Sequence, residues 1–153
     1  MRIRMLCQED YPDVDSLVNG LHKIHVNGRP ELFRDVPHIV SVESYEKMLT
    51  DADYICIGAE KDGRIIGICI SCLLSRICMV DMCSARIDHL YVDEKYRHQG
   101  VATELFQNMA SLSKDRGAVR LDLTVWDFNK DAMAFYRAMG MRTQKYEMEL
   151  SLQ

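Results

Sequence analysis

The sequence lacks the features that would indicate a membrane protein, a nucleic-acid-binding protein or a string of domains. No apolar run among its 153 residues approaches the roughly 20 residues that span a bilayer, and no secretory h-region is recognisable near residue 1. The 19 Lys and Arg residues are outnumbered by 23 Asp and Glu, and the net charge of −4 argues against nucleic acid as a partner. No repeat, low-complexity segment or linker divides the chain. We therefore expect a single domain over residues 1–153, in the cytoplasm, with no membrane partner.

Cysteine, by contrast, is not scarce, because the chain contains six. Cys69 and Cys72 form a C-x-x-C pair, a spacing that can hold a metal ion or a redox disulfide. Both lie within the apolar run 65–74, which reads as a buried strand, and residues three apart on a strand point to opposite faces. We therefore expect free, buried thiols and no metal, as in a reducing compartment. A metal site or a disulfide is the alternative.

The segment from Ile87 to Thr103 predicts a strand, a tight turn and the start of a helix. β-Branched and aromatic residues alternate with polar ones up to Val92, and the polar turn ends at Gly100. Free N–H groups and the helix dipole make such a helix N-terminus an anion site, and Gly100 permits a positive φ there. Neither Gly-Lys-Ser/Thr nor G-x-G-x-x-G follows, which excludes a Walker A loop and the dinucleotide fingerprint.

Two motifs in this half of the chain resemble the signatures of the GCN5-related N-acetyltransferase (GNAT) family. The turn carries Arg97-x-x-Gly100-x-Ala102, similar to the Gln/Arg-x-x-Gly-x-Gly/Ala motif that cradles the pyrophosphate of coenzyme A. Taken alone, this turn could be an ordinary connection between a strand and a helix. The second motif follows in the family's order, with Met where the family commonly has Phe: Asn129-x-x-Ala132-x-x-Phe135-Tyr136-x-x-x-Gly140-Met141.

The expected elements cover the chain from end to end. Apolar alternation and turn residues predict strands at residues 2–7, 54–60, 65–74, 87–92, 119–126 and 141–152. Helical spacing and caps predict helices at residues 11–27, 44–50, 101–116 and 130–139, with loops at 29–41 and 75–84. The predicted fold class is α/β (α+β). The resemblance implies a GNAT fold, with a mixed, mostly antiparallel sheet of six to seven strands, about four helices on both faces, and a splay between the two central strands.

The resemblance also implies that acetyl-CoA binds at this splay as co-substrate. Its pantetheine arm pairs with the central strand at Leu90, Tyr91 and Val92, where a backbone N–H meets the acetyl carbonyl. Asn129 touches the same arm, and Tyr136 lies beside the thioester sulfur. The residues implied for the pyrophosphate site are Arg97, His98, Gln99, Gly100, Val101 and Ala102.

Acetyl transfer to an amine requires a neutral amine, a polarised carbonyl and a proton for the leaving thiolate. Tyr136 is the expected catalytic acid, although a core tyrosine is the alternative interpretation. A lysine-like amine is almost wholly protonated at neutral pH, so a base is needed. Asp88, expected on the same strand face as Leu90 and Val92, is the first candidate. His89, expected on the opposite face, and the absence of any dedicated base are the alternatives.

The sequence favours an acetyl-CoA-dependent N-acetyltransferase that acts on a primary amine of a small molecule, peptide or protein, by direct attack in a ternary complex. The alternatives are an N-acyltransferase that uses another acyl-CoA, and a non-catalytic acyl-CoA-binding regulatory module. The family resemblance also suggests a homodimer. The acceptor itself is not specified. Candidates for lining its entrance, with packing roles as the alternative, are His22, His25, Phe33 and Arg34.

Overall fold

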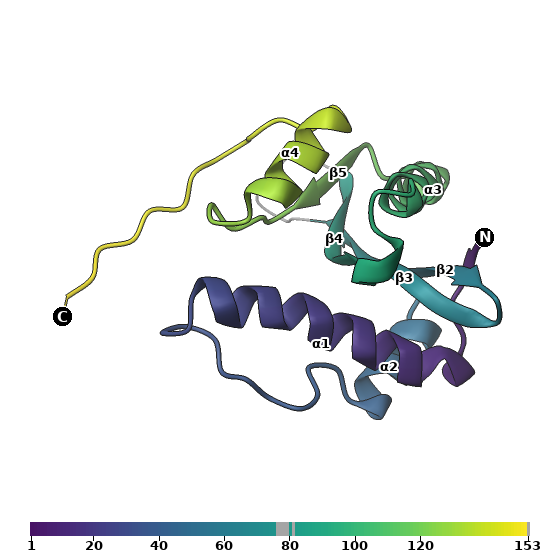
Figure 1. Ribbon diagram of the computed structural model, residues 1–153. Coiled ribbons are helices and arrows are strands. Elements are labelled where there is room, and N and C mark those ends of the chain that lie inside the picture. The colour runs from purple at the N-terminus through teal and green to yellow at the C-terminus, as the bar shows by residue number, and fades with distance from the viewer. Residues whose placement is uncertain (76–79, 81, 153) are drawn as a thin grey trace.

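Five strands form one open sheet in the order β1-β2-β3-β4-β5 (Figure 1). The computed structural model describes residues 1–75, 80 and 82–152. Neighbouring strands are antiparallel except for β4 and β5, which are parallel. The strands are β1 (Arg2–Met5), β2 (Tyr54–Lys61), β3 (Arg64–Ser75), β4 (Cys83–Val92) and β5 (Arg120–Leu123). The helices are α1 (Tyr11–Gly28), α2 (Val42–Thr50), α3 (Val101–Asp115) and α4 (Lys130–Ala138), with 3-10 turns at Gln8–Asp10 and Glu94–Tyr96.

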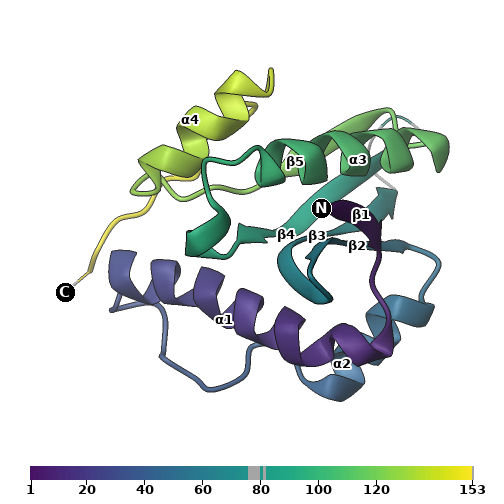
Figure 2. The ribbon, with the colours of Figure 1, turned by 45° about the vertical axis from the view of Figure 1, so that its right-hand side comes forward.

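Helices cover both faces of the sheet (Figure 2). On one face, α1 and α2 bury Val14 and Tyr45 against the strands. On the other face, α3 buries Leu105 and Met109, and partly buried side chains of α4 join the same cluster. Because β2 and β3 are covered on both sides, each contains a long run of consecutive buried residues. None of the helices among the described residues is long and apolar enough to cross a membrane.

Local sequence signals set several element ends as expected. Asp62 and Gly63 have φ values of 52° and 77°, which is the conformation that a two-residue hairpin turn between β2 and β3 requires. The Ser41 hydroxyl accepts a backbone N–H bond at the start of α2. The Asn129 side chain accepts from the Ala132 N–H at 3.1 Å and caps α4. These positions are decided by nearest neighbours in the chain.

The fold class is confirmed, but the described residues form a sheet of five strands where six to seven were expected. Residues 141–152 form no strand and pair with none of the described strands. The strand expected at 119–126 is reduced to the four residues of β5. The loop expected at 75–84 is shorter, since β3 runs to Ser75 and β4 begins at Cys83. Residues 76–79 and 81 of that loop lie outside the described residues.

A β-bulge interrupts β4 at the position of the expected catalytic base. Ile70 of β3 pairs with His89, and the next residue, Ser71, pairs with Ile87. Asp88 is therefore the extra residue of the bulge, and it has no partner in the β3–β4 register. An inserted residue reverses the face on which the following side chains lie.

This bulge overturns the expectation that Asp88 shares a face with Leu90 and Val92. Ile87 and Leu90, three positions apart, both pack in the core cluster beneath α3, together with Val92. The Asp88 carboxylate lies on the opposite face, where the Arg86 Nε donates to it at 2.9 Å. Simple alternation failed here because it assumes an unbroken ladder.

The first strand is joined to the start of α1 by a partly buried ion pair between Arg4 and Asp10. The two guanidinium Nη atoms donate to the two Asp10 carboxylate oxygens at 2.7 and 2.8 Å, and the Cys7 N–H donates at 2.8 Å. The Arg4 guanidinium lowers the pKa of Asp10 to about 2. Asp10 therefore stays ionised at lower pH in the folded protein than in the unfolded chain. Its contribution to the free energy of unfolding is fully present above pH 3.8 and is lost as the pH falls towards about 2.

Changing Arg4 to Met is expected to lower the free energy of unfolding by about 2 kcal/mol at pH 7, since Asp10 would remain buried without its cation. Arg2 offers a matched control, because it pairs with Glu60 at 3.0 Å but is largely exposed. Arg2→Met should cost less than about 1 kcal/mol. Urea unfolding of both variants measures the difference, and equal losses would contradict a special role for the Arg4–Asp10 pair.

Candidate active site

β4 and β5 pair over a short stretch and then separate. The last register pair is Ile87 with Leu123, whereas β4 continues to Val92. Beyond Leu123, residues 124–126 have no strand structure. Among the described residues, no strand pairs with the β5-facing edge of residues 88–92. The splay that the resemblance implied is present, and it leaves backbone donors and acceptors for an extended ligand.

The turn after β4 brings the N-terminus of α3 to the end of this splay. His98 and Gly100 both have positive φ, 59° and 82°. Gly100 is the N-cap of α3 and provides no side chain to accept the first helical N–H groups, which therefore point outward unpaired. A Cβ at Gly100 would have no heavy atom within 4 Å, so the space before the helix is open. The predicted strand, turn and helix are confirmed, and anion binding at this helix N-terminus stays a prediction.

The Arg97 side chain closes this turn. Its Nε donates to the Val92 carbonyl at 3.1 Å, and its guanidinium lies 5.1 Å from the centroid of the Tyr91 ring. Its Nη1 also lies 3.6 Å from a Glu94 carboxylate oxygen. The Tyr91 hydroxyl in turn lies against α1 at Gly20, where a Cβ would come within 2.7 Å of it. The structure thus gives Arg97 a positioning contact that the sequence motif alone did not predict.

The remaining residues expected to bind the cofactor differ in what they can offer. The Val101 side chain is buried in the core beneath α3, so only its backbone is available to a ligand. Ala102 is partly buried against the same core. The Gln99 side chain donates to the Lys95 carbonyl at 3.0 Å. The Asn129 carbonyl oxygen is used in capping α4. Backbone N–H groups are therefore the main donors that this turn could offer to an anion.

Tyr136 of α4 packs on the α3 side of the splay. Its ring centroid lies 5.3 Å from that of Phe135 and 6.4 Å from that of Phe106, and Leu90 belongs to the same cluster. Burial raises the pKa of the Tyr136 phenol above its usual value of 10, and Cys69 adds to this rise. The hydroxyl makes no hydrogen bond to any other described residue. The phenol therefore remains protonated over the ordinary working range of pH.

Asp88 and His89 lie on the α1 side of the splay, because of the bulge. Burial lowers the pKa of His89 below 6.5, Asp88 opposes this shift, and His25 of α1 adds to it. Burial also lowers the pKa of His25, with a smaller contribution from His22. His89 and His25 are thus neutral at pH 7. Tyr136 and the two candidate bases therefore lie on opposite sides of β4.

Aromatic side chains form a cluster on the α1 side of the splay, and only part of this cluster was predicted from the sequence. Phe33 stacks on His25 with centroids 5.2 Å apart, and meets the Trp126 ring edge-on at 5.5 Å. The His22 Nε2 lies 2.7 Å from the Arg34 carbonyl, which fixes the loop onto α1. Trp126 was not singled out, since nothing in its local pattern places it beside a loop more than 90 residues earlier.

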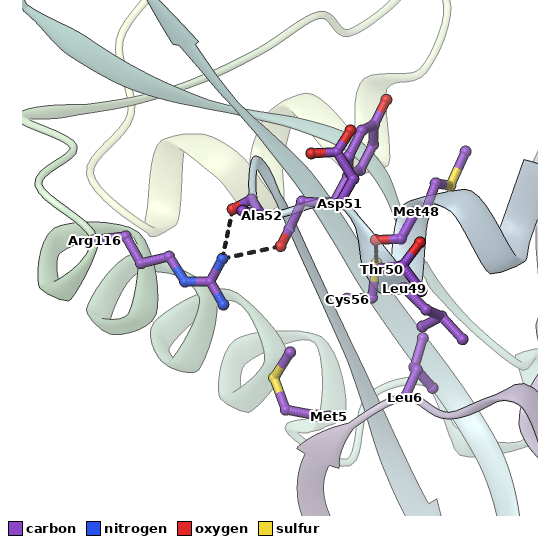
Figure 3. A pocket seen from close by; sticks show the side chains of 10 residues that line it. Met5, Leu6, Met48, Leu49, Thr50, Asp51, Ala52, Cys56 and Arg116 are labelled. Carbon is purple, nitrogen blue, oxygen red and sulfur yellow. Dashed lines mark hydrogen bonds between the residues drawn. The ribbon is translucent and has the colours of Figure 1, made fainter.

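A separate pocket of about 170 Å³ lies between α2, the start of β2 and the end of α3 (Figure 3). Arg116 donates from one nitrogen to the carbonyls of Ala52 and Tyr54, at 2.8 and 3.2 Å. None of the predicted site residues lines this pocket. Its arginine joins α3 to β2, which is a structural role.

The two cysteines of the C-x-x-C pair point to opposite faces, as expected. Cys69 is buried in the cluster beneath α3 and pairs with Leu90, whereas Cys72 lies opposite Tyr54 and Arg86. The five described cysteines are all free thiols, but burial was expected too widely: Cys56 and Cys69 are buried, whereas Cys72 and Cys83 are partly exposed and Cys7 is exposed. In the described part of the chain, no three side chains of metal-binding type lie together.

The sequence model of the Acetyltransferase (GNAT) family matches residues 18–141, most of the chain. The chain belongs to this family. A crystal structure of the BH1408 protein from Bacillus halodurans resembles the whole GNAT fold described above, with a TM-score of 0.95, 28% identity and complete coverage of both chains. This likeness includes residues 141–152.

Two GNAT relatives of known name match a shorter stretch of the chain. Thialysine N-epsilon-acetyltransferase from Bos taurus is 37% identical over 54 residues, which are 35% of this chain and 32% of that protein. The protein of the same name from Caenorhabditis elegans is 40% identical over 50 residues, which are 33% and 31% of the two chains. The match spans about a third of the length of these relatives.

Proposed function

We propose that this GNAT protein is an acetyl-CoA-dependent N-acetyltransferase that acts on a primary amine through a ternary complex. The observation that carries the proposal is the separation of β4 from β5 after Ile87, with an open helix N-terminus at one end and a protonated Tyr136 at one side. A splay with these two neighbours suits a ligand that has an extended amide chain, a pyrophosphate and a thioester.

The chain's own groups fit acetyl-CoA, which when bound supplies an activated acetyl group. Backbone groups of residues 90–92 on the edge that β5 leaves open, apart from the Val92 carbonyl that accepts from Arg97, can bind the amides of the pantetheine arm in the manner of an added strand. The N–H groups at the start of α3 can bind the pyrophosphate, because they are unpaired and lie at the positive end of the helix dipole. One N–H of β4 can polarise the acetyl carbonyl, for which one donor typically contributes about 3 kcal/mol.

Tyr136 is the proposed proton donor to the leaving thiolate. Its raised pKa keeps the proton available, and its unpaired hydroxyl can turn towards a sulfur in the splay. A non-catalytic binding module would not need such a group. This argues for turnover rather than for binding alone.

His89 is the better supported of the two candidate bases. It is neutral at pH 7 because burial lowers its pKa, and the nearby negative charge of Asp88 favours its protonated form once it accepts a proton. Asp88, our first choice from the sequence, is already paired with Arg86 at 2.9 Å. In this proposal Asp88 assists and His89 accepts the proton.

The acceptor class follows from the chemistry of the α1 side and from the two named relatives. Their name refers to the acetylation of an ε-amine, which is a primary amine at the end of a flexible chain. The aromatic cluster of Phe33, His25 and Trp126 offers flat surfaces on which such an aliphatic chain can pack. A net charge of −4 also favours a cationic substrate. We propose a small ω-amine as the acceptor.

Titration of acetyl-CoA into wild-type protein and into Gly100→Asp tests the binding half of the proposal. We expect wild-type binding and at least a hundredfold weaker binding by the variant, because a carboxylate would face the phosphates at a position with φ of 82°. Isothermal calorimetry measures both. Gly63→Asp is the matched control, since φ there is 77° but the position lies in the β2–β3 turn.

Turnover is then tested by thiol release from acetyl-CoA with a panel of ω-amines, α-amines and peptides, repeated with longer acyl-CoA thioesters. Binding without thiol release across the panel would favour the non-catalytic module. Faster release with another thioester would favour the acyltransferase alternative. No binding of acetyl-CoA by the wild type would refute the proposal as a whole.

A further inference from the structure

Two glycines lie within α1, and neither is required there by its backbone conformation. Gly20 is in the middle of the helix and Gly28 is its last residue. Neither has a positive φ, unlike Gly63 and Gly100 in their turns. Glycine destabilises a helix relative to almost every other residue, so a glycine in helical conformation needs another explanation. Here the explanation is the side chain that lies against each of them.

Both glycines leave room for an aromatic ring from another element. A Cβ at Gly20 would lie 2.7 Å from the hydroxyl oxygen of Tyr91 and 2.8 Å from a carbon of its ring, which is closer than carbon atoms can pack. A Cβ at Gly28 would overlap the ring of Phe128. We call these two contacts the Tyr91 seat and the Phe128 seat. They are about 12 Å apart along the helix, since eight residues separate them.

The two rings come from opposite sides of the splay. Tyr91 belongs to β4, and its ring centroid lies 5.1 Å from the guanidinium of Arg97 in the turn before α3. Phe128 lies beyond the end of β5, directly before the Asn129 that caps α4. α1 therefore bridges the splay on one face of the sheet, and its C-terminal end lies on the side of the molecule where α4 is found (Figures 1 and 2).

The N-terminal end of α1 is fixed independently of these rings. The Asp13 carboxylate accepts from the Ile65 N–H at 2.9 Å and from the Arg64 guanidinium at 2.6 Å, at the start of β3. A helix that is held at Asp13 and obstructed at Gly20 responds by tilting, because packed interiors transmit strain rather than absorb it. The tilt moves the C-terminal end of α1 furthest, so that end depends on both seats.

This C-terminal end carries the side chains of the proposed acceptor side. His25, one turn before Gly28, stacks on Phe33 with ring centroids 5.2 Å apart. Phe33 meets Trp126 edge-on, and Trp126 in turn stacks on Phe128 with centroids 6.1 Å apart. The Phe128 seat is therefore continuous with the aromatic cluster.

We propose that Gly20 and Gly28 are positioning residues, which seat α1 on both sides of the splay and thereby set the place of His25 and the aromatic cluster over it. Neither glycine touches a reacting group. The effect on catalysis rests on the proposed function, whereas the seating of α1 does not. The two are therefore tested separately.

Tryptophan fluorescence tests the seating of α1 without any substrate, because Trp126 is the single tryptophan of the chain. Gly20→Ala should shift its emission to longer wavelength, since a tilt of α1 withdraws Phe33 from the indole and admits water. Adding Tyr91→Leu removes the outer ring atoms that the new methyl group meets, and should return the emission towards that of the wild type. Asn27→Ala, at an exposed position of the same helix, is the matched control and should leave the emission unchanged.

Unchanged emission in a folded Gly20→Ala variant would overturn the proposal, and so would a double variant no closer to the wild type than the single one. If Gly20→Ala does not fold, Tyr91→Leu alone makes the same test, because it empties the Tyr91 seat without an overlap. It should also shift the emission, and an unchanged spectrum would again overturn the proposal.

Steady-state kinetics with n-pentylamine, or with a faster ω-amine from the panel, tests the effect on catalysis. Gly28→Ala should raise the KM for the amine at least about tenfold and leave the dissociation constant of acetyl-CoA within about threefold, because the phosphate turn lies at the other seat. Adding Phe128→Leu should lower the KM again. A wild-type KM in Gly28→Ala, or an equal loss of affinity for acetyl-CoA, would overturn the positioning role. A wild type that releases no thiol with any amine would refute the proposed function instead, and the fluorescence result would still decide the seating of α1.

Discussion

Replacing Tyr136 with Phe is expected to lower kcat for acetyl transfer by about 10²- to 10³-fold, while the affinity for acetyl-CoA changes less than about twofold. The substitution removes only the hydroxyl, which makes no hydrogen bond to the described residues, so the packing against Phe106 and Phe135 remains. Initial rates of thiol release and calorimetric titration of acetyl-CoA measure the two quantities. Because the raised pKa keeps the phenol protonated, wild-type kcat should show no loss below pH 10 that is due to this group.

Phe135 provides the matched control for this prediction, because it adjoins Tyr136 on α4 and packs in the same cluster. Phe135→Leu should lower thermal stability and leave kcat within a few-fold, since it removes packing but no proton donor. An unchanged kcat in Tyr136→Phe would assign Tyr136 to the core alone. A loss of acetyl-CoA binding in that variant, with kcat retained at saturation, would assign it to cofactor binding.

Changing His89 to Gln is expected to lower kcat/KM at pH 7 by about a hundredfold, since the transfer would lose its proton acceptor. The sign of the pH dependence follows from the pKa of His89, which burial lowers below 6.5. The wild-type rate should fall as the pH drops through that value, because a protonated imidazole cannot accept a proton. This limb below pH 6.5 should be absent in His89→Gln, whereas the rise towards alkaline pH that reflects the substrate amine should remain.

Asp88→Asn distinguishes the two candidate bases. If Asp88 only favours the protonated form of His89, its removal should lower the pKa of the acid limb and reduce the rate about tenfold or less. Asp88 would instead be the base if Asp88→Asn abolished the loss of rate at low pH and His89→Gln were nearly as active as the wild type. If the rate still fell at low pH in both variants, no dedicated base would operate.

Local chemistry made a large part of this protein predictable. The strand, turn and helix around Gly100 follow from residues within one segment, because a positive φ and an uncapped helix start depend on nearest neighbours. The Asp62-Gly63 hairpin and the Asn129 cap are of the same kind. The divergence of Cys69 and Cys72 follows from strand alternation in β3, which has no inserted residue between them.

Contacts between distant segments were not predictable in this way. The bulge at Asp88 depends on the register between β3 and β4, and it reversed the face of the expected base. The stacking of Phe33 on His25 and its contact with Trp126 depend on how α1 lies against the end of β5. The strand expected at 141–152 is absent: its apolar alternation is typical of a strand, but the segment does not pair with the free edge of β5.

Residue types at short spacing were therefore enough to predict the family and the strand, turn and helix around Gly100. Only the tertiary structure showed the face that Asp88 occupies, the packing of Phe33 against Trp126, and the absence of a strand at residues 141–152. The physical reason is the range of the interactions. Caps, turns and helical faces are fixed by side chains a few residues apart, whereas strand register and edge pairing are fixed only when distant backbone groups meet.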